Sequence, residues 1–212
     1  MKRLNFLMAC GVAVLPMAAA AQTVLLSEDF ESYADQAALE AAWTFSEAGY
    51  LTFNNSPGDG AEGSNKFVTM PSDFDPPSTG VDPYAYRNFT LHNPTDQDPI
   101  TLTVYVRSAN WGNSRAGISL RTNASSANIF MLGTNNGQTI DRFVARINGW
   151  GGSPGFIYFE SGPSRKPNTW FKLSGTIGDA TATFKVDDAD MDETASLTGG
   201  PAGGIGTVRI GN

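Results

Sequence analysis

The chain has 212 residues, with 14 Lys or Arg against 21 Asp or Glu and a formal net charge of −7. This length suits one domain with a sizeable core. The negative balance argues against a general nucleic-acid-binding protein, because phosphate contacts need clustered cations. The 23 glycines and the modest 17% of charged residues are typical of many strands and turns, not of disorder.

The first 21 residues have the pattern of a secretory signal peptide. A Lys-Arg pair at positions 2 and 3 precedes a mostly apolar run, and small residues lead to a cleavage site before Gln22. Cys10, the single cysteine, lies in a lipobox-like context, but the apolar run before it is too short to favour lipidation over ordinary cleavage. We therefore expect a secreted, periplasmic or cell-surface protein that does not stay inserted in a membrane.

The stretch that follows combines a strand-like start with a short helix. "LLSEDFESY" reads as an edge strand, and "DQAALEAAW" reads as a helix with Asp35 as its N-cap. One apolar stripe of this helix holds Leu39 and Trp43, so we expect it to lie across an open end of the fold.

From Pro99 onward the chain alternates between apolar and polar residues. In "PITLTVYVRS" the apolar side chains point to one face, and Tyr105 and Arg107 point to the other. Further such segments follow, separated by Gly, Asn, Ser or Pro clusters: "GISLRTN", "NIFMLGT", "RFVARIN", "GFIYFES", "WFKLSGTIG", "TATFKVDD" and "GTVRIGN". This pattern predicts an all-β fold, an antiparallel two-sheet jelly-roll sandwich.

The chain resembles the concanavalin A-like lectin/glucanase superfamily, and most of all the laminin-G-like jelly-roll domains of secreted bacterial proteins. The likeness lies in four places: Asp29 to Tyr33, Trp43, Trp170 to Leu173, and Phe184 to Asp187. It implies a single domain over residues 22–212. Such domains usually close with a further strand that carries an aromatic residue and acids. Here "GTVRIGN" ends at Asn212, so we expect either sequence beyond it or a missing last strand.

Motifs for catalysis are not found. The glucanases of this superfamily carry E-x-D-x-x-E on one strand, whereas Glu28 and Glu31 would face opposite sides of a strand. His92, the single histidine, has no cysteine or G-x-S-x-G partner for a nucleophilic triad. A non-catalytic carbohydrate-binding or adhesive module is therefore favoured. A polysaccharide lyase or glycoside hydrolase of the same fold, and a structural surface or matrix protein, remain as alternatives.

Six residues are predicted to bind the glycan. Trp111 and Trp150 lie in Gly- and Asn-rich turns, where an indole either stacks on a sugar ring or folds back over an end of the sandwich. The outward positions of the strands carry cations and a tyrosine, which we expect on one concave face: Tyr105, Arg107, Arg121 and Arg146. Arginines favour acidic or sulfated glycans, so the expected partner is a polysaccharide or glycoconjugate, acidic if these arginines bind it.

Structural calcium is the one cofactor that the sequence suggests. Two groups of acids could hold it, Glu28, Asp29 and Glu31 in the opening stretch, and Asp188, Asp190 and Asp192 in "DDADMDE". The second group lacks the glycine and the final glutamate of an EF-hand, so a charged hairpin tip is the favoured interpretation there.

Overall fold

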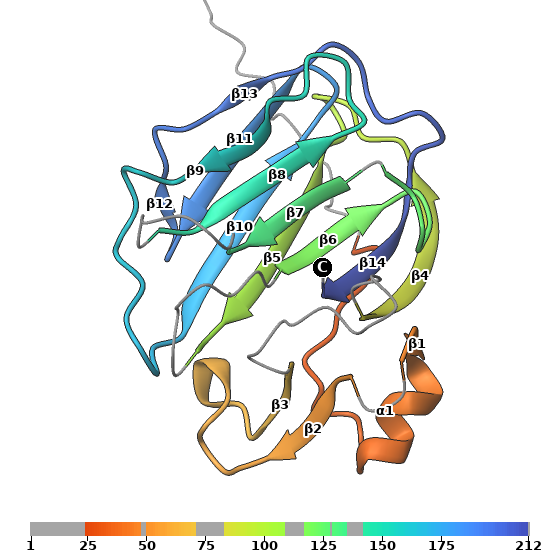
Figure 1. Ribbon diagram of the computed structural model, residues 1–212, viewed down its shortest axis with the longest axis vertical. Coiled ribbons are helices and arrows are strands. Elements are labelled where there is room, and N and C mark those ends of the chain that lie inside the picture. Colours follow the sequence, from red (N-terminus) through yellow and green to blue (C-terminus); the bar gives the residue numbers. More distant parts are fainter. Residues whose placement is uncertain are drawn as a thin grey trace, which may run out of the picture.

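The computed structural model describes residues 24–47, 50–70, 83–108, 117–127, 129–134 and 142–211 (Figure 1). The predicted secretory segment lies outside these residues. The part of the chain described holds one α-helix, α1 (Gln36–Ala42), and a short 3-10 turn, η1 (Ala61–Gly63). No helix among these residues is long and apolar enough to cross a membrane.

The strands form two main antiparallel sheets and a separate hairpin. The larger sheet has the order β1 (Thr44–Phe45), β4 (Tyr84–His92), β14 (Ile205–Gly211), β6 (Gly117–Arg121), β7 (Ile129–Gly133), β8 (Val144–Asn148), β9 (Gly155–Tyr158). The smaller sheet has the order β12 (Ala189–Asp190), β11 (Thr181–Val186), β10 (Phe171–Ile177), β5 (Ile100–Val106), and β13 (Ala195–Ser196) also pairs with β11. The hairpin joins β2 (Thr52–Asn55) to β3 (Lys66–Thr69).

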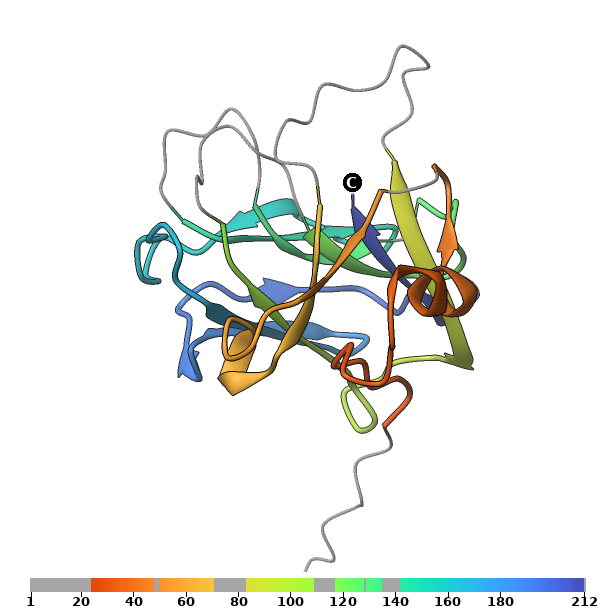
Figure 2. The ribbon, with the colours of Figure 1, turned by 90° about the horizontal axis from the view of Figure 1, so that it is seen from below.

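The core fills the space between the two main sheets, which Figure 2 shows as two layers. Alternate residues of β5, β10 and β11 are buried there, as period-two strands require. The Phe130 ring of the larger sheet meets the Phe184 ring of the smaller one at 6.3 Å between centroids. Gly175 makes this approach possible, because a Cβ there would lie 2.6 Å from Phe130. The predicted all-β antiparallel sandwich is confirmed.

The expected helix is confirmed, but the expected opening strand is wrong. Asp35 caps α1 by accepting a hydrogen bond from the N–H of Ala38 at 2.9 Å. Residues 24–35 contain no strand. The Glu28 carboxylate accepts from the N–H of Phe30 at 2.8 Å, and Phe30 has a positive φ of 62°. Such bonds from a side chain to the nearby backbone compete with a strand ladder.

Instead of extending a sheet, the opening segment closes one end of the sandwich. Tyr33 is buried and donates to Glu28 Oε2 at 2.5 Å, and Arg87 of β4 donates to the same oxygen at 2.9 Å. The Phe30 ring stacks on Trp43, which follows α1 and is buried. Burial and the Glu28 carboxylate raise the pKa of Tyr33 above its ordinary value.

Candidate functional site

The outer face of the larger sheet gathers cations and aromatic rings in cross-strand rows. Residues directly opposite each other on antiparallel strands share a face. One row runs from β4 to β9 through Tyr86, Arg209, Ser119, Met131, Arg146 and Phe156. The next row holds Asn88, Thr207, Arg121, Ile129 and Asn148. We call these two rows, with Tyr84 and Tyr158 beside them, the arginine face. Its described strand positions carry three arginines and no carboxylate.

Arg121 lies near the centre of the arginine face and is only 7% exposed. Its Nε donates to Ser119 Oγ at 3.0 Å, and its Nη1 donates to the carbonyl of Ser126 at 3.0 Å. Burial, and then the positive charges of Arg209 and Arg146, lower the pKa of Arg121 to about 10. The guanidinium is still charged at neutral pH, so this face keeps a concentrated positive charge.

Arg209 supports the same region from β14. Its guanidinium carbon lies 3.7 Å from the centre of the Tyr84 ring, and its Nη1 donates to the carbonyl of Ala124 at 3.2 Å. Because both Arg121 and Arg209 bond carbonyls of the turn between β6 and β7, this turn is fixed beside the arginine face.

The β8–β9 side of the arginine face combines a cation with an aromatic platform. Phe156 and Tyr158 lie two residues apart on β9 and therefore on the same side of the strand. The centroids of their rings lie 6.3 Å apart, and the ring planes meet at 27°. The Arg146 guanidinium lies over Phe156 at 5.1 Å. With its amide oxygen toward Arg146, Asn148 accepts from Nε and Nη2 at 3.0 Å each. These four side chains are all half-buried.

A second hydrophobic cluster supports this platform. Ile129, Met131 and Val144 are buried on the outer face of the larger sheet, separate from the main core, and Phe156 and Tyr158 pack against them. An apolar cluster on the outside of a sandwich is not needed to fill the interior. It presents flat aromatic surface beside polar groups, which is the composition of a sugar-binding site.

The predicted glycan-binding residues do not share one face. Arg121 and Arg146 lie together on the arginine face. Tyr105 occupies an outward position of β5 in the smaller sheet, and Arg107 comes directly after this strand. Both residues therefore lie on the opposite side of the sandwich from the arginine face. The expectation of a single concave face holding all four is therefore wrong, because alternation tells inward from outward but does not tell which sheet a strand joins.

Tyr105 and Arg107 contact the segment that joins β2 to β3. The Tyr105 hydroxyl donates to Glu62 Oε1 at 2.5 Å, and this bond raises the pKa of Tyr105. Arg107 donates to both carboxylate oxygens of Asp59, at 2.5 and 3.0 Å, and its guanidinium carbon lies 5.2 Å from the centre of the Trp170 ring. The bond to Arg107 lowers the pKa of Asp59. Both side chains thus attach the hairpin to the smaller sheet.

The two predicted stacking tryptophans differ in what the structure describes. Trp150 is 4% exposed and belongs to the main core, so it does not form an exposed stacking surface, and the alternative of an indole folded back over the sandwich is the one observed. The turn brings it inward because Gly151 bridges to Thr198, where a Cβ at Gly151 would lie 2.3 Å from the Thr198 carbonyl oxygen. Trp111 lies outside the described residues.

Five of the six acids proposed for calcium have carboxylates that contact groups of the protein. Glu28 bonds Tyr33 and Arg87 as above, and Asp29 accepts from the N–H of Glu31 at 2.9 Å. The Glu31 carboxylate accepts from the Ser64 hydroxyl and from the backbone N–H groups of the two residues that follow Ser64. At the hairpin tip, the carboxylates of Asp188 and Asp190 each lie within salt-bridge distance of a lysine. The backbone N–H of Asp192 donates to a serine hydroxyl. Within the described ranges, no three acids, histidines or cysteines are grouped to hold a metal.

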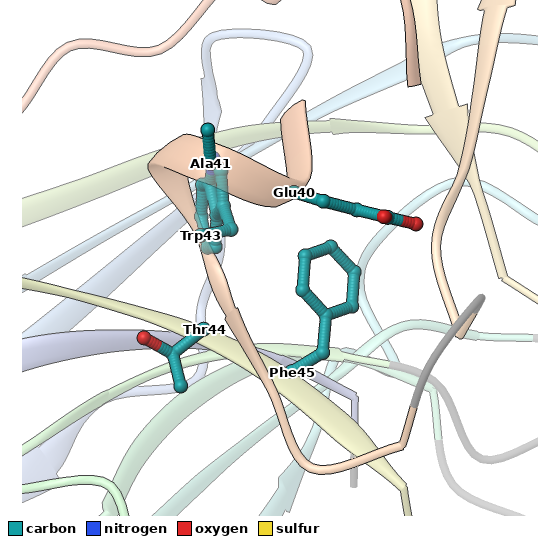
Figure 3. A pocket seen from close by; sticks show the side chains of 5 residues that line it. All are labelled: Glu40, Ala41, Trp43, Thr44 and Phe45. Atoms are coloured by element: carbon teal, nitrogen blue, oxygen red, sulfur yellow. The ribbon is translucent and has the colours of Figure 1, made fainter. Parts of the chain in front are cut away.

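A cavity beside α1 has no convergent polar groups. It measures about 440 Å³ and is lined by Glu40, Ala41, Trp43, Thr44 and Phe45 (Figure 3). Its one charged group, the Glu40 carboxylate, already accepts from the Gln36 amide at 2.8 Å. The arginine face is therefore the stronger candidate.

Several residues of this face were missed by the sequence-based prediction. "GFIYFE" is apolar on both sides of the strand, so Phe156 shows no contrast that marks it as a surface residue. The alternation in "GTVRIGN" predicts that Arg209 points outward. Its position beside the other arginines depends on the pairing of β14 with β6, which the local pattern does not predict.

Comparison with known proteins gives matches among solved structures. No family model matches the chain, and no curated protein matches it in sequence. Among solved structures, the chain is similar to one described as an apo Crh5 transglycosylase, with a TM-score of 0.37 and 13% sequence identity. That match covers 62% of this chain and 52% of the other, so the chain spans about half the length of that protein. A similarity at this level carries no argument about function, which rests here on the residues themselves.

Proposed function

We propose that this protein is a non-catalytic, extracytoplasmic carbohydrate-binding or adhesive module that binds a glycan on its arginine face. The observation that carries the proposal is the half-buried aromatic platform of Phe156 and Tyr158 beside Arg146 and Asn148. A sugar ring presents a C–H face that packs on such rings, and its hydroxyls bond to guanidinium and amide groups at the rim.

The chemistry of the arginine face supports binding over hydrolysis. A glycosidase needs two carboxylates about 5 to 10 Å apart at the scissile bond. The described strand positions of this face hold arginines, tyrosines and amides, and no carboxylate. A ligand would thus find cations and hydrogen-bonding groups there without the acid pair that cleaves a glycosidic bond.

The extracytoplasmic location is proposed from the first 21 residues, which have a positive start, an apolar run and small residues before Gln22. N-terminal sequencing of the exported protein tests it. The expected N-terminus is Gln22, and retention of the whole chain in the cytoplasm would contradict the proposal.

Affinity electrophoresis through gels that each contain one neutral or acidic polysaccharide tests the binding function. We expect retardation by at least one polysaccharide, and we expect Tyr158→Ala to abolish it because half of the aromatic platform is lost. Tyr105→Ala is the matched control, since it removes an aromatic ring from the outer side of the other sheet.

Each outcome decides a separate point. Loss of binding in Tyr105→Ala with binding kept in Tyr158→Ala would move the site to the smaller sheet. No retardation by any polysaccharide would overturn the binding function. Release of unsaturated ends that absorb in the ultraviolet would identify a polysaccharide lyase instead.

A further inference from the structure

The turn between β2 and β3 is a compact unit outside both main sheets (Figure 1). We call its residues, 56–65, the lid. The N–H of Ser56 donates to the carbonyl of Asn65 at 2.8 Å. The N–H of Gly60 donates to the carbonyl of Ser64 at 2.9 Å. Because these bonds lie within the lid, it can move as a whole without losing them.

The lid has no large apolar side chain. Its sequence, SPGDGAEGSN, offers one proline and one alanine as hydrocarbon side chains, and neither belongs to the core. The strands beside it differ, because Phe53 of β2 and Val68 of β3 pack against the core. A segment with few buried apolar contacts opens at a lower free-energy cost than the elements around it. The base of the hairpin is therefore held by packing, and the lid is held by polar contacts.

Two carboxylates attach the lid to the smaller sheet. Asp59 accepts from Arg107, directly after β5, at 2.5 and 3.0 Å, and the Asp59 carbonyl accepts from the Trp170 indole N–H at 3.0 Å. The Tyr105 hydroxyl donates to the Glu62 carboxylate. The Asp59 side chain is 46% exposed, so water can replace its contact with the guanidinium.

A third carboxylate holds the far end of the lid. Glu31 of the opening segment accepts from the Ser64 hydroxyl and from the N–H of Asn65. Lys66, the first residue of β3, adds an attraction to the same carboxylate. Three acids therefore carry the attachment of the lid to the rest of the described structure.

Two further charged side chains face these contacts. Lys172 of β10 acts through its charge on both Tyr105 and Glu62. Asp188, in the turn after β11, also acts on Tyr105. Lys172 and Asp188 form an ion pair at 2.8 Å, so their opposite charges offset each other. The charge that holds the lid is therefore set by the three acids and their own partners.

These attachments weaken as the pH falls. The hydrogen bond from Arg107 lowers the pKa of Asp59 below its ordinary 3.8. The Ser64 hydroxyl lowers the pKa of Glu31 below its ordinary 4.5. A carboxyl whose pKa is lower in the closed state stabilises that state fully above its ordinary pKa, and this contribution is lost as the pH falls through the lowered value. The lid is therefore held tightly at neutral pH and loosely below about pH 4.

From this geometry we propose that the lid is an acid-released cover, closed over the Trp170 indole at neutral pH and open in acid. Opening separates Asp59 from Arg107 and frees the Trp170 N–H from the Asp59 carbonyl, while the two main sheets keep their packing. The inference goes beyond the binding function, because the lid contacts the smaller sheet, opposite the arginine face.

The test is fluorine NMR of the full chain labelled with fluorotryptophan, with a neutral paramagnetic chelate in the solvent. The chelate broadens the resonance of each indole that it can reach. We expect the Trp170 resonance to broaden about twofold or more between pH 7 and pH 3, because the lid opens. The Trp150 resonance, from a core indole, should keep its width and report that the sandwich stays folded. Replacing Trp170 or Trp150 with phenylalanine assigns its resonance.

Variants of the acids assign the effect. Asp59→Asn removes the charge of one attachment while keeping its shape, and should raise the open-to-closed ratio at pH 7 about two- to fivefold. Adding Glu62→Gln should raise the ratio further. Asp190→Asn is the matched control, since it removes an exposed aspartate that pairs with Lys185 of the same sheet. This control should leave the Trp170 resonance unchanged.

Each contrary result overturns the inference. An unchanged Trp170 width from pH 7 to pH 3 would show that no lid opens. Broadening of Trp170 and Trp150 together would show unfolding of the whole domain in place of a local opening. Equal effects of Asp59→Asn and Asp190→Asn would show that Asp59 does not hold the lid.

Discussion

Replacing Arg121 with methionine removes a buried guanidinium while keeping a long, flexible side chain in its place. The environment lowers the pKa of Arg121 from its ordinary value to about 10. Since a tenfold change in proton affinity corresponds to about 1.4 kcal/mol, the folded protein disfavours the charged form by about 3 kcal/mol. The two hydrogen bonds to neutral acceptors offset about 1 to 2 kcal/mol of this cost.

We therefore expect Arg121→Met to raise the free energy of unfolding of the unliganded protein by about 1 to 2 kcal/mol, as when a buried charge is replaced by an apolar group. For a domain of this size the melting temperature should rise by a few degrees. The same variant should also be retarded less in polysaccharide gels, because the positive charge of the arginine face is reduced. Stability gained with affinity lost is the pattern of a residue kept for binding.

Urea denaturation monitored by tryptophan fluorescence measures the first effect, and affinity electrophoresis measures the second. Lys185→Met is the control, because an exposed cation contributes less than about 0.5 kcal/mol. If Arg121→Met lowers the free energy of unfolding by more than about 1 kcal/mol, the bonds of Arg121 to Ser119 and Ser126 dominate, and Arg121 is a structural residue.

Three further predictions concern stability. Trp150→Ala should lower the free energy of unfolding by about 3 to 5 kcal/mol, because the indole is buried in the core; a loss below about 1 kcal/mol in urea melts would place the ring at the surface. Gly151→Ala should cost about 1 to 3 kcal/mol, because the new Cβ would overlap Thr198; an unchanged urea midpoint contradicts the bridge. The Ser64 hydroxyl and nearby N–H groups lower the pKa of Glu31 below its ordinary 4.5, so its stabilising contribution is complete above pH 4.5 and is lost as the pH falls further. Glu31→Gln should flatten this acid dependence in thermal melts at pH 2 to 7, and an unchanged slope would refute it.

Strands and helix ends that depend only on neighbouring residues were predicted correctly from the sequence. The alternation around Leu102 and Val104 gave the strand and its buried side, because period two depends only on neighbouring residues. Asp35 marked the start of α1 because its carboxylate caps the first turn within three residues.

Non-local contacts decided the rest. Tyr105 and Arg121 look alike in sequence, each an outward residue of an alternating strand, but β5 and β6 join different sheets. The glycines around Trp150 predict a turn but do not tell whether the indole points inward or outward. The bridge between Gly151 and Thr198, which is distant in sequence, turns it inward. The candidate site was thus predicted only in part, through Arg121 and Arg146.

The position of β14 limits how this protein can fold. It lies in the middle of the larger sheet and hydrogen-bonds to β4 on one side and β6 on the other, although both precede it by more than 80 residues (Figure 1). Until residues 205–211 arrive, the sheet is in two pieces, each with an unpaired edge that invites aggregation. Contacts this distant in sequence also slow folding. The larger sheet of this domain therefore cannot be completed until residues 205–211 have been synthesised.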